Sequence, residues 1–443
     1  MLRSALAALV SAGASRMLIT TRLLSTGVLA SAGAPRVGLE EQLQQAPWVL
    51  LLQVPGAGRG LFAAADIEQG TVVYEEAPML WTPHPAPAPP TTCHACLRPL
   101  APSAGCEEAR ASGISDSTSS SDGDHSAGRQ GSAPRLRFCS PGCRADAEAT
   151  WAAAAADCDF WPLQQACREA GEKFPLMAAQ LACMQVQRWQ QQQQQQQDGT
   201  EQHGTAGGTS TVTSTGGAPA AAPAWQGEPP TRGDALTQLH HLCYANIAVP
   251  PEPWVRLHSL LLRGLQPLAS SARWAGVCTA ERLQLEFSPE WFCGVLARLH
   301  LNAFRVDTVP PLDLSDPSAL LRAAAASLGG SGAAAAAFGA AVPGSSSGGS
   351  SSGSGAGSTA QHHPGSAAFL LASMLNHSCE PNLDISWPHN NAVARFTAAR
   401  DIAAHEQLTI SYIDAEQSAA QRQAALQFAY GFSCGCPRCR EGA

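Results

Sequence analysis

The feature that most constrains the fold of this chain is a run of three cysteines near its end. Cys434, Cys436 and Cys439 place three thiols within six residues. Zinc prefers four ligands in a tetrahedron, and short cysteine spacings let one turn supply several of them. Fortuitous spacing and redox-active thiols are the alternatives. We expect a zinc site whose fourth ligand comes from elsewhere, and Cys379 is the natural candidate.

The number of cysteines also bears on the kind of protein. Fifteen cysteines would suit disulfides in a small secreted domain, but the chain has 443 residues and its start lacks the pattern of a secretory signal. Several cysteines also fall in tight Cys-x₁₋₃-Cys spacings. Metal binding therefore explains them better than disulfides do.

Composition divides the chain into folded blocks and solvated insertions. With 40 Gly and 32 Pro, and with much of the hydrophobic 45% being alanine, long parts of the chain cannot be packed core. A Ser/Gly/Asp tract covers 112–133, a polar low-complexity linker opening on glutamines covers 190–233, and an Ala/Gly/Ser-rich insertion covers 323–365. We expect two or three folded blocks between these tracts.

The hydrophobic patterns of the folded blocks predict an α+β protein with many short strands. The predicted strands are the apolar or β-branched runs at 48–54, 71–74, 392–396 and 407–412. The predicted helices lie at 144–189, 234–304, 367–375 and 418–428.

Charge and hydropathy argue against two classes of partner. The formal net charge is −8 and no compact Lys/Arg cluster is present, so a surface that coats nucleic acid is not expected. The long uncharged stretch at 333–342 is Ala and Gly with almost no large apolar side chains, which is not the pattern of a membrane span. We expect a monomer with no direct nucleic-acid partner and no membrane segment.

Residues 1–38 have the composition of an organelle transit peptide. They carry four arginines and many Ser and Thr among Leu and Ala, with no acidic residue before Glu40. Mitochondrion and plastid are not separated by these features. A disordered tail or a start codon set too far upstream would give the same pattern, and a misassigned start would return the protein to the cytoplasm or nucleus.

Four separated motifs resemble SET domains, in the order of that family. Residues 376–382, Asn-His-Ser-Cys-Glu-Pro-Asn, resemble the NHSCxPN motif and are the most specific string in the chain. Residues 408–414 resemble the second signature, an apolar strand that ends in a tyrosine, Tyr412. Upstream, 58–63 followed by 70–73 resembles the opening of the SET domain.

The resemblance implies a SET fold of short β-sheets in which the two signature segments form a pseudoknot, an exception to the usual absence of threading. It also implies a methyltransferase that uses S-adenosylmethionine and methylates lysine ε-amines of a protein, histone or non-histone. Tyr412 would line the methyl-transfer channel, and Tyr430 and Phe432 would form its aromatic walls. The cofactor would be held by Gly58, Arg59, Gly60, Asn302, Asn376, His377 and Tyr412.

Two short strings narrow the resemblance to the SMYD type, in which a MYND zinc finger is inserted into the SET domain. They are Leu-Asn-Ala-Phe at 301–304 and Tyr-Gly-Phe at 430–432. In that finger the outer cysteine pairs share one zinc. The implied ligands are Cys93, Cys96, Cys139 and Cys143.

The second zinc of a MYND finger needs an inner Cys-x-x-Cys and a later His-x₃-Cys, which this chain lacks. Residues 104–137 contain only Cys106 and His125, and no histidine lies between Trp151 and Cys158. We therefore expect a degenerate finger without a regular second zinc, and about two structural zinc ions in all.

The resemblance also divides the chain. The expected parts are a transit peptide (1–38), a first SET part (48–92), a MYND-like insert (93–160), the linker (190–233), a helical SET insert (234–306), the Ala/Gly/Ser-rich insertion (323–365), a catalytic SET part (366–415) and a cysteine-rich post-SET segment (416–443).

Two other functions share these features. A catalytically silent SET and zinc-finger scaffold would keep the fold without turnover, and Tyr412 would then be a core tyrosine. Tyr430 and Phe432 could equally serve simple packing of the post-SET helix. A small-molecule methyltransferase would share the cofactor site, and it differs in not accepting lysine peptides.

Overall fold

The computed structural model describes residues 37–84, 92–100, 107–109, 136–201, 234–245, 247, 249–308 and 362–442. The predicted transit peptide, the tract at 112–133, Cys106, His125 and most of the two long insertions therefore lie outside the described residues. Those expectations stay predictions.

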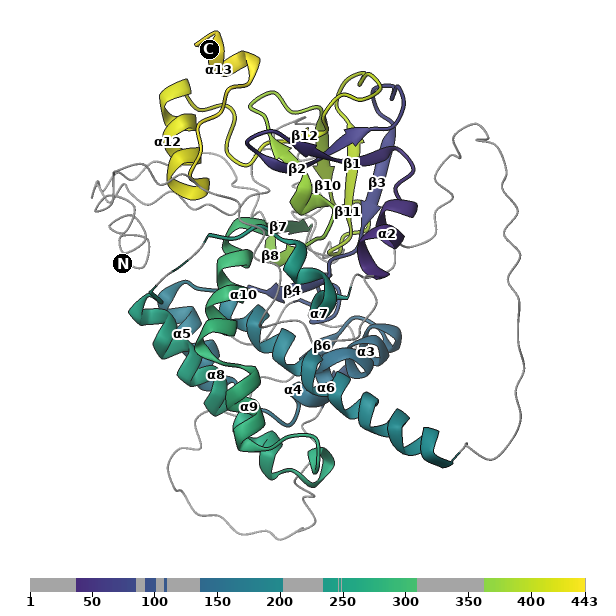
Figure 1. Cartoon of the computed structure of the whole chain (residues 1–443), viewed down its shortest axis with the longest axis vertical. Helices are drawn as coiled ribbons and strands as arrows, with labels where there is room; N and C mark the ends of the chain where they lie inside the picture. The colour runs from purple at the N-terminus through teal and green to yellow at the C-terminus, as the bar shows by residue number, and fades with distance from the viewer. Residues whose placement is uncertain are drawn as a thin grey trace, which may run out of the picture.

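Short strands from both ends of the chain form the upper part of the molecule in Figure 1. A two-stranded sheet pairs β1 (Val49–Val54) with β2 (Gly58–Ala63). A three-stranded sheet has the order β10 (Leu383–Ser386), β11 (Ala394–Ala398), β3 (Val72–Glu76). Another has the order β4 (Leu80–Pro83), β8 (His362–Ala368), β7 (Ala303–Thr308). The two remaining pairs are β9 (Asn376–His377) with β12 (Thr409–Ile410), and β5 (Glu107–Ala109) with β6 (Leu136–Phe138).

Helices from the middle of the chain form the lower part of the molecule (Figure 1). The longer ones are α5 (Trp161–Ala170), α6 (Phe174–Glu201), α8 (Glu252–Ser270) and α10 (Pro289–Asn302). The shorter ones are α3 (Pro141–Ala147), α4 (Ala153–Ala155), α7 (Ala235–Gln238) and α9 (Ala280–Glu286). Outside this part lie α2 (Val37–Gln44), α12 (Ala419–Tyr430) and α13 (Pro437–Arg440). The described helices include none long and apolar enough to cross a membrane.

Two parts of the SET resemblance that are far apart in sequence fold as one unit. The N–H of Leu408 donates to Leu61 at 2.8 Å, and the N–H of Ala404 donates to the Asp66 carboxylate 338 residues away, also at 2.8 Å. β3 pairs with β11, and β4 pairs with β8. The helical middle is thus an insertion between two halves of a single set of sheets.

The two signature segments lie side by side, as the predicted pseudoknot requires. β9 and β12 run parallel, with Asn376 opposite Thr409 and His377 opposite Ile410. The N–H of Ser378 extends the pairing by donating to the carbonyl of Ile410 at 3.0 Å.

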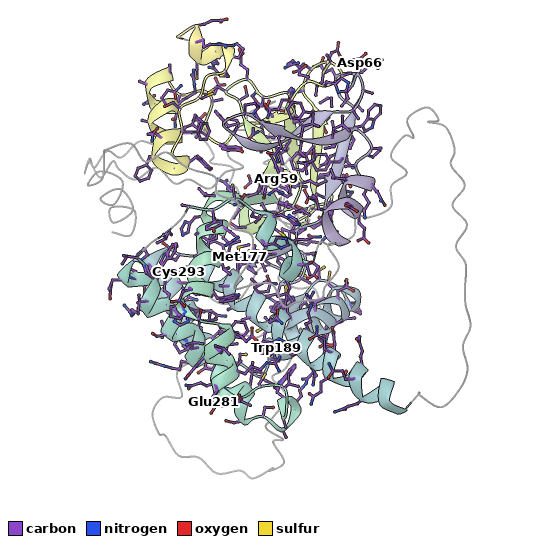
Figure 2. The ribbon with its side chains drawn as sticks, in the orientation of Figure 1. Arg59, Asp66, Met177, Trp189, Glu281 and Cys293 are labelled. Carbon is purple, nitrogen blue, oxygen red and sulfur yellow. The ribbon has the colours of Figure 1, made fainter. Side chains whose placement is uncertain are left out.

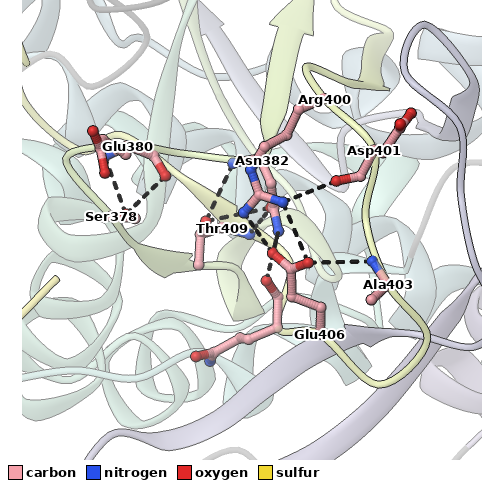
Figure 3. Close-up of polar contacts among 9 residues, drawn as sticks. Ser378, Glu380, Asn382, Arg400, Asp401, Ala403, Glu406 and Thr409 are labelled. Atoms are coloured by element: carbon pink, nitrogen blue, oxygen red, sulfur yellow. Dashed lines mark hydrogen bonds and ion pairs between the residues drawn. The ribbon is translucent and has the colours of Figure 1, made fainter. Parts of the chain in front are cut away.

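Asn382, the last residue of the first signature, fastens this pairing (Figure 3). Its buried side-chain amide donates to the carbonyl of Gln407 at 2.8 Å and to the Glu406 carboxylate at 3.0 Å. Its side-chain oxygen accepts the N–H of Thr409 at 2.8 Å. Arg400 pairs with the same Glu406 carboxylate. One asparagine therefore satisfies backbone groups that a two-residue strand would otherwise leave unpaired.

Within the predicted helical region 234–304, apolar residues at helical spacing face the core. Of the four leucines on this face of α8, Leu257, Leu261 and Leu265 are at most 3% exposed, and Leu260 is partly buried against the core. Trp291, Val295, Leu296 and Leu299 of α10 are also buried. The helical spacing of these residues therefore predicted the correct faces.

Two predicted boundaries in the middle of the chain were wrong. α6 continues to Glu201, through the glutamine run assigned to the linker from 190, because glutamine is a good helix former and the helix is already nucleated upstream. Residues 367–368 end strand β8 instead of starting a helix, and only Ala372–Met374 are helical, as one 3₁₀ turn. β8 is the central strand of its sheet, and a fully buried strand has a continuous apolar run that resembles a buried helix.

Replacing Asn382 tests whether it holds the crossing together. Asn382→Ala should lower the free energy of unfolding by about 2–3 kcal/mol, because it leaves buried backbone groups without partners. Asp384→Ala, on the exposed face of β10, is the control and should change it by less than about 0.5 kcal/mol. Urea unfolding followed by tryptophan fluorescence measures both, and equal losses would contradict the role given to Asn382.

Candidate active site and thiol clusters

The first thiol cluster consists of Cys93, Cys96, Cys139 and Cys143, whose sulfur atoms all lie within 4.8 Å of one another. The sulfur of Cys139 is 3.6 Å from that of Cys96 and 3.5 Å from that of Cys143. Ser140 caps α3 by accepting the N–H of Cys143 at 3.1 Å, which turns the second cysteine pair toward the first.

His94 lies inside this cluster's loop but is held as a structural residue. Its Nδ1 accepts the N–H of Arg137 at 3.1 Å, and burial lowers its pKa to about 4, so the ring is neutral. The carbonyl of His94 accepts the indole N–H of Trp81 at 2.7 Å. On the other side, the carbonyl of Cys96 accepts the N–H of Ala392 at 2.7 Å. The first thiol cluster is thus fastened directly to the SET strands.

The second thiol cluster consists of Cys379, Cys434, Cys436 and Cys439, also within 4.8 Å of one another. The sulfur of Cys379 lies 3.4 Å from that of Cys439 and 4.0 Å from that of Cys434. The fourth thiol is therefore the one expected from the sequence.

Side chains of α12 support the second cluster. The Gln423 amide both donates to the carbonyl of Cys434 and accepts its N–H, at 2.8 and 2.9 Å. The buried guanidinium of Arg422 reaches Cys439 Sγ at 3.9 Å. These contacts hold the segment that carries the three C-terminal cysteines against α12.

Both clusters fit zinc. A zinc ion with Zn–S bonds of about 2.3 Å sets tetrahedral sulfur–sulfur separations of roughly 3.8 Å. The 3.4–4.0 Å separations in the clusters bracket that value, and they are far longer than a disulfide bond of about 2.05 Å. Each cluster could therefore hold one zinc ion.

An aromatic cluster lies next to the second thiol cluster. The ring of Tyr412 is 4.9 Å from that of Tyr430 and 6.4 Å from that of Phe432, centroid to centroid. The His377 ring is 5.3 Å from Tyr412. Gly431 ends α12 in the left-handed conformation (φ 74°), and this turn brings Tyr430 and Phe432 to the same ring. The structure thus brings together the three aromatic residues expected to wall the channel.

Tyr412 is held at both its backbone and its hydroxyl. Its N–H donates to His377 Nδ1 at 3.1 Å, and its hydroxyl donates to the carbonyl of Leu375. Because His377 Nδ1 accepts, the proton of the neutral ring is on Nε2, which is 3.3 Å from Cys379 Sγ. Burial lowers the pKa of His377 to about 4 and raises the pKa of Tyr412 well above its usual value. His377 therefore connects the second thiol cluster to the tyrosine.

The residues expected to bind the cofactor meet where the sheets join the helices. Asn376 donates to the carbonyl of Arg59 at 3.3 Å. A side chain at Gly60 would come within 2.9 Å of the Asn376 amide, so this approach needs glycine. At Gly58, by contrast, nothing lies within 4 Å of where a Cβ would stand, which leaves room for a ligand. Figure 2 places Arg59 between the strand-rich and helical parts.

Sequence reasoning missed the segment that completes this group. The guanidinium of Arg59 donates to the carbonyl of His241, and Asn302 donates to the carbonyl of Cys243 at 2.7 Å. The Cys243 thiol lies 3.5 Å from the side-chain oxygen of Asn302 and is close enough to Tyr412 to raise its pKa. His241 contributes its backbone carbonyl to the contact with Arg59, and Cys243 has no partner cysteine at ligand spacing. No signal in the sequence pointed to either.

Removing one thiol tests the second cluster. Cys436→Ser should lower the zinc content by one ion per chain and destabilise the C-terminal segment, because metal binding and folding are coupled there. Cys293→Ser, in α10 and outside both thiol clusters, should leave the zinc content unchanged. Metal analysis of both variants decides, and an unchanged zinc content in Cys436→Ser would show that this cluster does not hold zinc.

Comparison with known proteins agrees with this geometry. Residues 298–413 match the SET domain family. Histone-lysine N-methyltransferase ATXR4 of Arabidopsis thaliana is 31% identical over 151 residues, which are 34% of this chain and 36% of the relative. Protein-lysine N-trimethyltransferase SMYD5 of Mus musculus is 45% identical over 78 residues, 17% of this chain and 19% of the relative. Histone-lysine N-methyltransferase SET5 of Meyerozyma guilliermondii is 44% identical over 80 residues, 18% and 17% of the two chains.

The chain thus spans little more than a third of the first of these relatives, and less than a fifth of the other two. The match to the SET family begins at residue 298, but strands that precede it contact residues inside the matched region: β3 pairs with β11, β4 pairs with β8, and Phe62 of β2 bridges to Gln407. Residues 298–413 therefore match the SET domain, and the chain is similar to lysine methyltransferases that include a SMYD protein.

Proposed function

We propose that this protein transfers methyl groups from S-adenosylmethionine to lysine ε-amines of a protein substrate. The observation that carries the proposal is the setting of Tyr412. Its hydroxyl is fixed on the carbonyl of Leu375, inside an aromatic cluster and beside the residues expected to bind the cofactor. The names of the similar proteins, which are lysine methyltransferases, support the same reaction.

The residues expected to bind the cofactor suit a charged, polar ligand. S-adenosylmethionine supplies a methyl group on a sulfonium that a deprotonated amine can accept. Gly58 offers backbone next to open space, and the Asn376 amide, which donates one N–H to the carbonyl of Arg59, has a second N–H. Asn302 is buried and donates to the carbonyls of Cys243 and Arg298, so it orders the site. The guanidinium of Arg59 donates to the carbonyl of His241, so this side chain orders the site; burial lowers its pKa.

Tyr412 would orient the amine and would not remove its proton. Burial raises the pKa of its hydroxyl, so the group stays protonated near neutral pH. Its single proton is donated to the carbonyl of Leu375, and its oxygen then acts as an acceptor for an N–H of the incoming amine. The contribution is alignment, which can be worth orders of magnitude in rate.

The aromatic walls would select a lysine side chain and help it lose its proton. Ring faces attract an ammonium or methylammonium group by cation–π interaction. An apolar, desolvated channel lowers the pKa of an amine inside it. Burial also raises the pKa of Tyr430, so its hydroxyl adds no negative charge to that channel.

Two finer features belong to the same proposal. We propose that the first thiol cluster is a degenerate MYND-like finger with a single zinc, whose role is to clamp the SET strands through His94 and Cys96. We also propose that residues 1–38 direct the protein to a mitochondrion or plastid, where its substrate would be a non-histone protein.

Removing one hydroxyl tests the proposed chemistry. Tyr412→Phe should lower the rate of lysine methylation roughly a hundredfold, because the amine loses its orienting partner, while S-adenosylmethionine binds as before. Radiolabelled methyl transfer to lysine-containing proteins measures the rate, and calorimetry measures the binding.

Tyr74→Phe is the matched control for this substitution. It removes a buried hydroxyl that has no hydrogen-bond partner among the described residues, and it should leave the rate within about twofold. Wild-type rates in Tyr412→Phe would remove Tyr412 from the mechanism. A folded wild-type protein that binds the cofactor but methylates no lysine would instead favour the scaffold function.

A further inference from the structure

A buried carboxylate outside the proposed active site holds a turn of the chain. Glu76, the last residue of β3, is 2% exposed. Its Oε1 accepts the N–H groups of Leu370 and Leu371 at 2.7 and 2.9 Å, and its Oε2 accepts that of Ala372 at 2.9 Å. These residues are 294 to 296 positions away in sequence.

The three amides, at 370–372, lead into a single 3₁₀ turn, Ala372–Met374, whose N-cap residue Leu371 makes no side-chain cap. The first amides of a helical turn lack partners within it and attract negative charge. Burial raises the pKa of Glu76 to about 7, and the three amide bonds oppose that rise. Tyr74, two residues earlier on β3, lies close enough to Glu76 for the carboxylate to raise its pKa as well.

The turn held by Glu76 leads directly to the hydroxyl of Tyr412. Leu375 follows the turn, and its carbonyl is the acceptor of that hydroxyl. Ser373, within the turn, donates its hydroxyl to the carbonyl of Phe369, and this hydroxyl lies 3.4 Å from the carbonyl of Asn302. A shift of this turn would therefore move the Leu375 carbonyl, which accepts the hydroxyl of Tyr412. It would also move Ser373 relative to Asn302, one of the residues expected to bind the cofactor.

We propose that Glu76 is a positioning residue for methyl transfer: its carboxylate fixes the 370–372 turn that sets where the carbonyl of Leu375 holds the hydroxyl of Tyr412. This role rests on the proposed function. It differs from a purely structural role because the carboxylate holds one turn, and the residue after that turn, Leu375, holds the hydroxyl of Tyr412.

Glu75, the neighbouring residue of β3, provides a matched control. Its carboxylate is also buried, but it pairs with Arg395 and lies 3.1 Å from His389 Nε2, on a sheet face away from the turn. Removing the charge of either glutamate should lower stability. Only the change at Glu76 removes the acceptor of the amides at 370–372.

The experiment compares Glu76→Gln, Glu76→Asp and Glu75→Gln in the full chain, each normalised to its folded fraction. Glu76→Gln places an amide N–H where a carboxylate oxygen accepted one, so kcat should fall roughly tenfold or more, with the KM for S-adenosylmethionine changed less than about threefold. Glu76→Asp retains the charge and should recover part of the rate. Glu75→Gln should keep kcat within about twofold.

A second readout does not depend on turnover. The chain has only four tyrosines, so fluorotyrosine labelling gives a simple ¹⁹F NMR spectrum in which Tyr412→Phe assigns the Tyr412 signal. Glu76→Gln should shift or broaden that signal, and Glu75→Gln should leave it in place.

An unmoved Tyr412 signal in Glu76→Gln, or equal loss of kcat in both glutamine variants, would overturn the proposal. If Glu76→Gln does not fold, Glu76→Asp takes its place in both measurements. If the wild-type protein methylates nothing, the proposed function fails, and the ¹⁹F spectra still decide whether Glu76 positions Tyr412.

Discussion

The arrangement of this protein depends on the parallel contact between two short segments, β9 and β12. Each contributes only two residues to the pairing, which alone is too little to be stable in water. The contact persists because Asn382 bridges the two segments and because β2 binds next to both, through Arg59 to Asn376 and through Leu61 to Leu408. Asn376 and His377, two of the residues expected to hold the cofactor, form β9, and His377 accepts the backbone N–H of Tyr412 just after β12.

The second thiol cluster extends that dependence to metal binding. Cys379 belongs to the first signature segment, while the other three thiols come from the segment after α12. A zinc ion shared by the four would bring the two together, and with them Tyr430 and Phe432 against Tyr412. His377 contacts Cys379 on one side and the backbone of Tyr412 on the other, so the metal site and the aromatic cluster share one imidazole. A zinc ion here would not take part in the reaction, but it would help to fix the position of Tyr412 through His377.

The sequence predicted the residues of the site better than the framework around them. The resemblance to SET domains grouped Tyr412 with Tyr430 and Phe432, and the three clustered C-terminal thiols called for a fourth ligand, for which Cys379 was the candidate; the structure brings the members of each set together. The sequence could not predict the contacts of Arg59 with His241 or of Asn302 with Cys243. Those contacts are made by backbone carbonyls, which any residue could supply. The role of Glu76 could not be predicted either, because its partners are backbone amides, which any residue except proline could supply.

Element boundaries were the weakest part of the sequence prediction. The apolar run before the first signature was expected to be helical, but its first residues form the central strand of a sheet whose other strands lie far away in sequence. The glutamine run was expected to be a linker because its composition is polar, whereas its helix propensity extends α6. Local patterns do not contain the tertiary contacts that decide such cases.

The central claim is that these segments form a working cofactor site. Calorimetric titration of the purified, zinc-loaded protein with S-adenosylmethionine tests it most directly, with zinc counted on the same sample. The account predicts saturable binding of one cofactor per chain by a protein that holds about two zinc ions. A folded protein with both zinc ions in place and no affinity for S-adenosylmethionine would contradict it.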